Sequence, residues 1–184
     1  MSQSVGAIEL SSIAAGFKVQ DAMLKAAAIE ILIARTICSG KYFIVFSGNI
    51  SAVETAMDTA VNQGADAVVD TLVAANPYDG IFPALSQSVV LNADEIGALG
   101  VIETFSGVSA IAAADAAGKA ANVTLFRLHL AMALGGKGLL LMTGSVSDVT
   151  AAVEAAAADV RKQGLLVAEL VIPRPNPELF AEYI

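Results

Sequence analysis

The most reactive side chain in this sequence is that of its single cysteine, Cys38, in the segment Thr36-Ile37-Cys38-Ser39-Gly40-Lys41. A thiolate is both a nucleophile and a soft metal ligand. One cysteine forms no intramolecular disulfide, which fits a reducing compartment, and it matches no Cys-x-x-Cys spacing. Most lone cysteines are semi-buried thiols without chemistry, so the residues alone favour that interpretation.

Other ionisable residues do not form a catalytic group in the sequence. His129 has Arg127 two residues away on the same side of a predicted strand, with no acidic or cysteine companion at ligand spacing, which indicates a packed or hydrogen-bonded histidine. Glu9 and Glu103 occur at equivalent places, which favours a structural role such as capping or pairing at a module interface over acid–base chemistry. Without a phosphate loop, a Ser-His-Asp arrangement or a His-rich motif, we expect no enzyme and no catalytic residue.

These residues belong to a sequence module that occurs twice in the chain. Gly6-Ala7-Ile8-Glu9 recurs 94 positions later as Gly100-Val101-Ile102-Glu103, and Asp21 recurs at the same interval as Asp115. Self-similarity in conserved order indicates repeated structural units. We therefore predict two domains, residues 1–92 and 93–184.

Hydrophobic periodicity and turn residues predict the same elements in both copies. The first copy is predicted to have a helix capped by Ser11-Ser12, a helix opened by a Ser51/Glu54 capping box, and strands at residues 5–10, 29–37, 42–46 and 67–74. The second has strands at residues 99–104, 123–130, 137–143 and 165–172, a hairpin loop at 131–136, and a short final helix with Asn176 as N-cap and Pro177 as its first residue. The order β-α-β-β-α-β in each copy predicts an α+β chain of two tandem ferredoxin-like modules.

Composition limits the classes of partner. The chain is 56% hydrophobic and only 15% charged, with a net charge of −8. Its basic residues are scattered, so we expect no nucleic-acid partner, and no uncharged run is long enough to cross a bilayer, so we expect no membrane partner. Because so much apolar surface must be covered, we expect subunit contacts.

The ordered motifs resemble the shell-domain family of bacterial microcompartments. The resemblance rests on Gly100-Val101-Ile102-Glu103-Thr104, residues 115–123 and Val171-Ile172-Pro173-Arg174-Pro175, and it covers essentially the whole chain in two copies. It implies the non-permuted tandem type, in which three chains form a pseudo-hexagonal trimer. Such a trimer is a tile of a protein shell in the bacterial cytoplasm, beside neighbouring shell proteins.

Within that family, the loop at Cys38 is similar to the Cys-Pro-Gly-Lys loop of the iron–sulfur tandem type of propanediol-utilisation compartments, with Ser39 in place of proline. The resemblance implies a [4Fe–4S] cluster on the trimer axis, held by Cys38 of three chains, and an encapsulated redox enzyme as a partner. It also implies residues that line a central pore: Ile37, Cys38, Ser39, Gly40, Leu134, Gly135 and Gly136. Lys25, Lys119 and Arg174 would lie at the tile edge, and the first copy has Tyr78 in the segment equivalent to that of Arg174.

Three functions remain open at this point. The first is a tile with an axial cluster for electron transfer across the shell or redox sensing. The second is a tile whose axis is an open pore for small metabolites, lined by glycines that are equally well explained as hairpin-turn residues. The third is a trimeric ligand-sensing protein, since ferredoxin-like modules also build metabolite-binding regulators.

Overall fold

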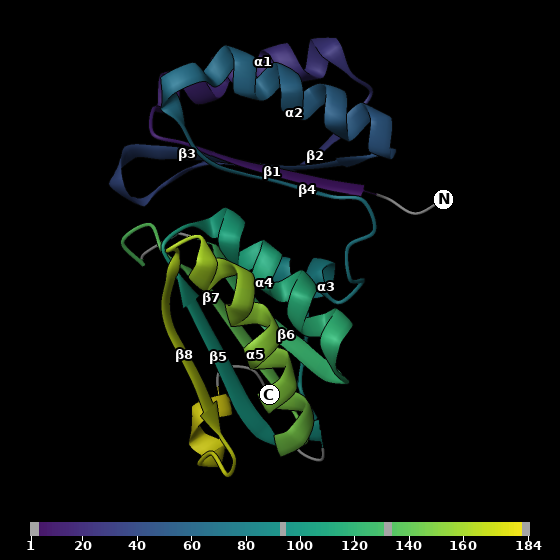
Figure 1. Cartoon of the computed structure of the whole chain (residues 1–184), viewed down its shortest axis with the longest axis vertical. Coiled ribbons are helices and arrows are strands. Elements are labelled where there is room, and N and C mark those ends of the chain that lie inside the picture. The colour runs from purple at the N-terminus through teal and green to yellow at the C-terminus, as the bar shows by residue number, and fades with distance from the viewer. Residues whose placement is uncertain (1–3, 93–94, 131–133, 182–184) are drawn as a thin grey trace. The chain divides into compact units, whose positions relative to one another are not determined.

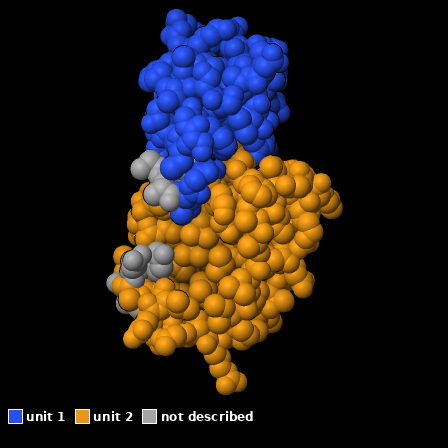
Figure 2. All heavy atoms as spheres, turned by 90° about the vertical axis from the view of Figure 1, so that its left-hand side faces the viewer, with its two compact units in different colours: residues 1–77, 131–136 blue, residues 78–130, 137–184 orange. Residues whose placement is uncertain are grey.

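The structure is a computed structural model that describes residues 4–92, 95–130 and 134–181. The described residues form two compact units (Figure 2). Unit 1 holds the residues up to Pro77 together with 134–136, and unit 2 holds 78–130 and 137–181. The domain limits 1–92 and 93–184 remain a prediction. Within the described residues, no helix has the length and apolar character needed to span a membrane.

Unit 1 is a four-stranded antiparallel sheet in the order β2-β3-β1-β4, with helices α1 and α2 on one face (Figure 1). Its elements are β1 (Ser4–Leu10), α1 (Ile13–Ala26), β2 (Glu30–Ile37), the 3-10 turn η1 (Cys38–Gly40), β3 (Lys41–Gly48), α2 (Ile50–Gly64), η2 (Ala65–Ala67) and β4 (Val68–Ala74).

Unit 2 repeats this plan, with a sheet in the order β6-β7-β5-β8. Its elements are α3 (Ile81–Leu85), β5 (Ala98–Thr104), α4 (Gly107–Ala120), β6 (Val123–Leu130), β7 (Gly138–Gly144), α5 (Val146–Lys162), β8 (Leu166–Ile172) and the 3-10 turn η4 (Pro177–Phe180). On one side, α4 and α5 pack against each other and against the sheet. A second apolar cluster includes Phe126 of β6 and Phe180 of η4, whose ring centroids are 5.7 Å apart.

The duplication extends to the irregularities of the sheets. The β2–β3 register shifts between Ile31 and Ile33, and the β6–β7 register shifts between Leu125 and Arg127, the equivalent place. A β-bulge re-aims the side chains that follow it, so its repetition shows that the two copies share backbone detail as well as element order. The prediction of two tandem ferredoxin-like modules is confirmed.

Most predicted helix ends are confirmed, with one correction. Ser12 caps α1 through a hydrogen bond to the backbone N–H of Ala15, and Asn176 caps η4. The prediction of Ser51 as the cap of α2 is wrong, because Asn49 accepts the N–H of Ala52 and the helix begins at Ile50. Asparagine is at least as good a cap as serine. Because Asn49 begins the helix two residues earlier, Ser51 and Glu54 both lie inside it and form no capping box. The connection between the modules also contains α3, which the sequence did not predict.

The core of unit 1 depends on one close approach inside its sheet. Phe46 of β3 is fully buried among Ile8, Val53 and Met57, and its ring lies over Gly6 of β1. A Cβ on Gly6 would be 2.2 Å from the Phe46 ring. The absence of a side chain at Gly6 therefore makes room for the ring of Phe46, one of the largest fully buried side chains.

We predict that Gly6→Ala lowers the free energy of unfolding by about 1–3 kcal/mol, because the added methyl group overpacks the core against Phe46. Gly48→Ala is the matched control, since a Cβ there would meet its nearest atom at 3.4 Å. Urea denaturation at fixed protein concentration measures both changes. Equal stabilities of the two variants would show that the core adapts at Gly6.

Candidate functional site

The hairpin loop that carries Cys38 has an unusual backbone. Cys38 is half-buried, and Ser39 and Gly40 both have positive φ, at 67° and 72°. A proline ring holds φ near −65°, so the observed conformation of Ser39 is one that proline does not adopt. The loop with Ser39 therefore differs in backbone from what the Cys-Pro-Gly-Lys pattern would form.

The base of this loop is fixed by an ion pair. Lys41, the first residue of β3, places Nζ 2.7 Å from Oε1 of Glu9 on β1. The Glu9 side chain is fully buried and the Lys41 side chain is 23% exposed. Glu9 forms an ion pair, but the expected place of that pair, a module interface, is wrong, because its partner is a lysine of its own module. This anchor was missed in the sequence, although both residues recur in the second copy.

The second hairpin loop has the same anchor and different residues. Lys137 Nζ lies 2.8 Å from Oε1 of Glu103, whose side chain is 33% exposed. Gly135 and Gly136 have φ of 64° and 87°, which glycine adopts without steric strain. The two anchored loops thus carry a cysteine in one copy and two glycines in the other.

Unit 1 contains the residues predicted to line a pore, which are Ile37, Cys38, Ser39, Gly40, Leu134, Gly135 and Gly136. A Cβ on Gly136 would lie 3.7 Å from the carbonyl oxygen of Cys38, so these two loop segments are neighbours. A Cβ on Gly40 or on Gly135 would meet no atom within 4 Å, so both positions face open space. Their role in a pore remains a prediction, and residues 131–133 of the predicted loop lie outside the described residues.

The fit of an iron–sulfur cluster depends on the number of chains. In the part of the chain that the structure describes, no three His, Cys, Asp or Glu side chains are grouped as metal ligands. A four-iron cluster is held by thiolates, and one chain supplies one, Cys38. The residues therefore fit a cluster only where Cys38 of several chains converges.

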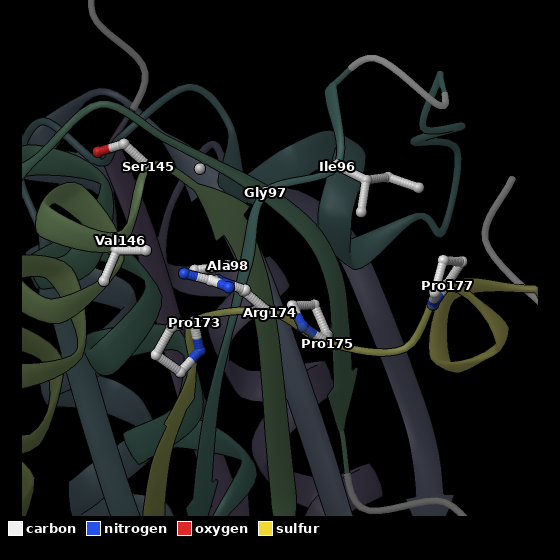
Figure 3. Close-up of a pocket in the computed structure, with 10 residues that line it drawn as sticks. Ile96, Gly97, Ala98, Ser145, Val146, Pro173, Arg174, Pro175 and Pro177 are labelled. Atoms are coloured by element: carbon white, nitrogen blue, oxygen red, sulfur yellow. The ribbon is translucent and has the colours of Figure 1, made fainter.

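The predicted edge residues lie on helix ends and on the segment after β8. Lys25 pairs with Asp21 at 2.6 Å and Lys119 with Asp115 at 2.7 Å, each one turn earlier on its helix. Arg174 is exposed and lines a hollow of about 530 Å³ together with Pro173, Pro175 and Ser145 (Figure 3). Their role at a tile edge remains a prediction.

The strand registers define which residue of the first copy corresponds to Arg174. Ala74 pairs with Val5 and Ile172 pairs with Leu99, its equivalent, so two residues beyond the strands Asn76 corresponds to Arg174. Tyr78 corresponds instead to Asn176. The two copies thus differ at the position of Arg174, as expected, but the first copy has asparagine there.

Residues 4–77 and 98–175 match the BMC domain. The chain belongs to the BMC domain family, the shell-protein family of bacterial microcompartments. It is 41% identical to the bacterial microcompartment shell protein PduT of Citrobacter freundii over 100% of this chain and 99% of that protein. The crystal structure of a microcompartment protein from Desulfitobacterium hafniense DCB covers 98% of this chain at a TM-score of 0.88 and 36% identity, with 99% of that chain aligned.

A shorter relative shows that one BMC domain also occurs alone. The shell protein PduA of Citrobacter freundii is 42% identical over 84 residues, which is 45% of this chain and 86% of PduA. The internal repeat of this chain is thus a tandem pair of BMC domains.

We predict that Lys41→Met lowers the free energy of unfolding by about 3 kcal/mol, because the fully buried carboxylate of Glu9 loses its cation. Lys137→Met is the matched control, and there the partly exposed Glu103 makes the expected cost about 1 kcal/mol or less. The second change Glu9→Gln in the Lys41→Met background should recover most of the loss. Denaturation curves measure all three, and equal costs for the two lysines would contradict the role of burial.

Proposed function

We propose that three copies of this chain form a pseudo-hexagonal tile in the shell of a cytoplasmic bacterial microcompartment, with Cys38 of each chain holding an axial [4Fe–4S] cluster. Full-length similarity to PduT and to the Desulfitobacterium hafniense structure supports the tile. The relatives are shell proteins by name, and no catalytic role is proposed for this chain.

The observation that supports the cluster is the unequal pair of loops. Both loops are anchored by the same lysine–glutamate pair, yet only the first carries a thiol. In a ring of three two-domain chains, each kind of loop occurs three times around the axis. Three thiolates would bind three irons, and the fourth iron would take a non-protein ligand such as water.

The residues around Cys38 suit a site close to an axis. The ammonium of Lys41 is neutralised by Glu9, so the base of the loop adds no net charge beside a thiolate. Gly40 and Gly135 have no side chain to separate neighbouring loops, so backbone N–H groups can approach a bound anion. When bound, the cluster would supply one-electron chemistry, for electron transfer across the shell to or from an encapsulated redox enzyme, or for redox sensing.

We predict that protein purified without oxygen is brown and contains about four irons per trimer, the content of one [4Fe–4S] cluster. Cys38→Ser should lose the colour and the iron while remaining a trimer, because only the ligand is removed. Iron analysis, the visible spectrum and electron paramagnetic resonance are the measurements.

Ser39→Gly is the matched control in the same loop, since glycine adopts the observed φ of 67° and keeps Cys38. It should retain its iron. A wild-type protein that stays colourless and iron-free after anaerobic reconstitution would exclude the cluster, and it would leave the shell tile in place.

The open space at Gly40 and Gly135 favours one alternative, a tile with a central pore for small metabolites and no cluster. We predict that bulky side chains at both Ser39 and Gly135 reduce the flux of small solutes through shells made with this protein, because they narrow the axis. Flux that is unchanged in Ser39→Trp/Gly135→Trp would argue against a pore there.

A further inference from the structure

One face of helix α1 is apolar and uncovered. Phe17 is 61% exposed, and Leu24, nearly two turns later on the same face, is 48% exposed. With Gln20, Asp21 and Tyr42 they line a groove of about 290 Å³. Tyr42 forms its floor, donating its hydroxyl to Oε1 of Gln20 at 2.8 Å, and its burial raises the pKa of that hydroxyl. Exposed apolar side chains grouped in this way indicate a contact surface.

The equivalent face of α4 in unit 2 is covered. Ile111, at the position of Phe17, is 1% exposed. The side chain of Asp115 is 19% exposed, whereas that of its equivalent Asp21 is 63% exposed. The two helices therefore have corresponding faces, one covered within the chain and one bare.

Tyr78, four residues after the end of β4, contacts α4 at Asp115 and Gly118, and the short helix α3 that follows it also contacts α4. The backbone N–H of Tyr78 donates to Oδ1 of Asp115 at 2.7 Å, and its hydroxyl donates to the carbonyl of Val123 at 3.4 Å. A Cβ on Gly118 would be 2.1 Å from the Tyr78 ring, so the ring lies on the helix where it has no side chain. The contact thus consists of a carboxylate that binds the backbone and a glycine that accommodates a large ring.

The second copy has a corresponding segment after its last strand, β8. By the strand registers Asn176 takes the place of Tyr78, and a proline precedes each of them, Pro175 and Pro77. Asn176 is exposed. Among the described residues, neither the backbone N–H of Asn176 nor Oδ1 of Asp21 has a hydrogen-bond partner. The other carboxylate oxygen, Oδ2, accepts from Lys25 in Asp21 and from Lys119 in Asp115.

The side-chain sizes at the two positions are exchanged. Within unit 2 a tyrosine meets a glycine, Tyr78 on Gly118. Asn176 and Leu24 are the equivalents of that pair, a small residue and a large one. A partner segment that carries asparagine at this point fits a helix that carries leucine, because the summed volume stays similar.

We propose that the groove on α1, lined by Phe17, Gln20, Asp21, Leu24 and Tyr42, binds the segment Pro175-Asn176 of a second copy of this chain. The backbone N–H of the partner's Asn176 donates to Asp21 as that of Tyr78 donates to Asp115. This inference rests on the proposed trimeric tile and names the residues that join its chains.

The contact is head-to-tail, because each chain has one groove and one segment. Contacts of this kind close into a ring or continue as a filament. In a ring of three chains, the Tyr78 contact inside each chain and the Asn176 contact between chains would alternate, giving six related contacts. In such a ring each chain's groove and each chain's Pro175-Asn176 segment take part in one contact, and no groove is left open.

The test is a size exchange followed by sedimentation velocity over a range of protein concentrations. Asn176→Tyr should weaken association by about tenfold or more, because the ring clashes with Leu24. Leu24→Gly in the Asn176→Tyr background recreates the tyrosine–glycine pair of unit 2 and should restore association to within a few-fold of wild type. Circular dichroism checks that each variant is folded.

The hydrogen bond has its own variant and control. Asp21→Ala should also weaken association by about tenfold or more, because the acceptor for the partner's N–H is lost. Lys25→Ala removes the same surface ion pair but keeps the carboxylate, so it should associate as wild type does.

Each outcome bears on a different claim. A trimer unaffected by Asp21→Ala and Asn176→Tyr, or an Asn176→Tyr defect that Leu24→Gly leaves in place, would overturn this contact and leave the tile standing. A wild-type chain that is monomeric at every concentration would overturn both. Absence of iron in an intact trimer would affect only the cluster.

Discussion

The two hairpin loops of this protein depend on a lysine–glutamate pair that joins the residue directly after each loop to the end of a neighbouring strand. Lys41 and Glu9 in the first BMC domain, and Lys137 and Glu103 in the second, are 2.7 Å and 2.8 Å apart. The fully buried carboxylate of Glu9 requires a partner and holds Lys41 in place, whereas the partly exposed Glu103 holds Lys137 more weakly. The residues between the anchors can then vary without loss of the loop's position, as Cys38 in one copy and Gly135-Gly136 in the other illustrate.

Duplication also allows the equivalent helices α1 and α4 to differ in the residues on their surface. Helices α1 and α4 occupy equivalent places, but Tyr78 contacts α4 at Asp115 and Gly118, whereas the corresponding face of α1 exposes Phe17 and Leu24. In a ring of identical single domains both faces would carry the same residues. A two-domain chain allows each contact and each loop to have its own sequence, and the proposed trimer would use this to place three thiols and three glycine-containing loops around one axis.

Much of the fold was predictable because its signals are local. Alternating and helical spacing of apolar residues, together with caps at Ser12 and Asn176, gave the element order of both copies. Local signals also explain the errors. Two capping patterns overlap at Asn49 and Ser51, and only the backbone path selects the first, while α3 is too short to show a periodicity.

The candidate site divides in the same way. The repeat in the sequence identified the two loops, and the single cysteine distinguished the first loop from the second. The sequence did not reveal that Lys41 neutralises Glu9, that Ser39 has a left-handed backbone, or that Asn76 rather than Tyr78 corresponds to Arg174. The ion pair and the correspondence of Asn76 depend on strand register, which joins residues more than thirty positions apart, and the backbone of Ser39 depends on the path of the hairpin turn.

The sequence by itself determined the architecture of two ferredoxin-like modules in one chain, because each module's pattern of strands and helices is encoded in short segments and written twice. Only the tertiary structure decided which helix face is covered and which is bare. On α4, the backbone N–H of Tyr78 donates to Asp115, 37 residues away, and its ring lies on Gly118. A hydrogen bond from the backbone carries no side-chain signature, so no reading of residue types distinguishes Asp115 from Asp21.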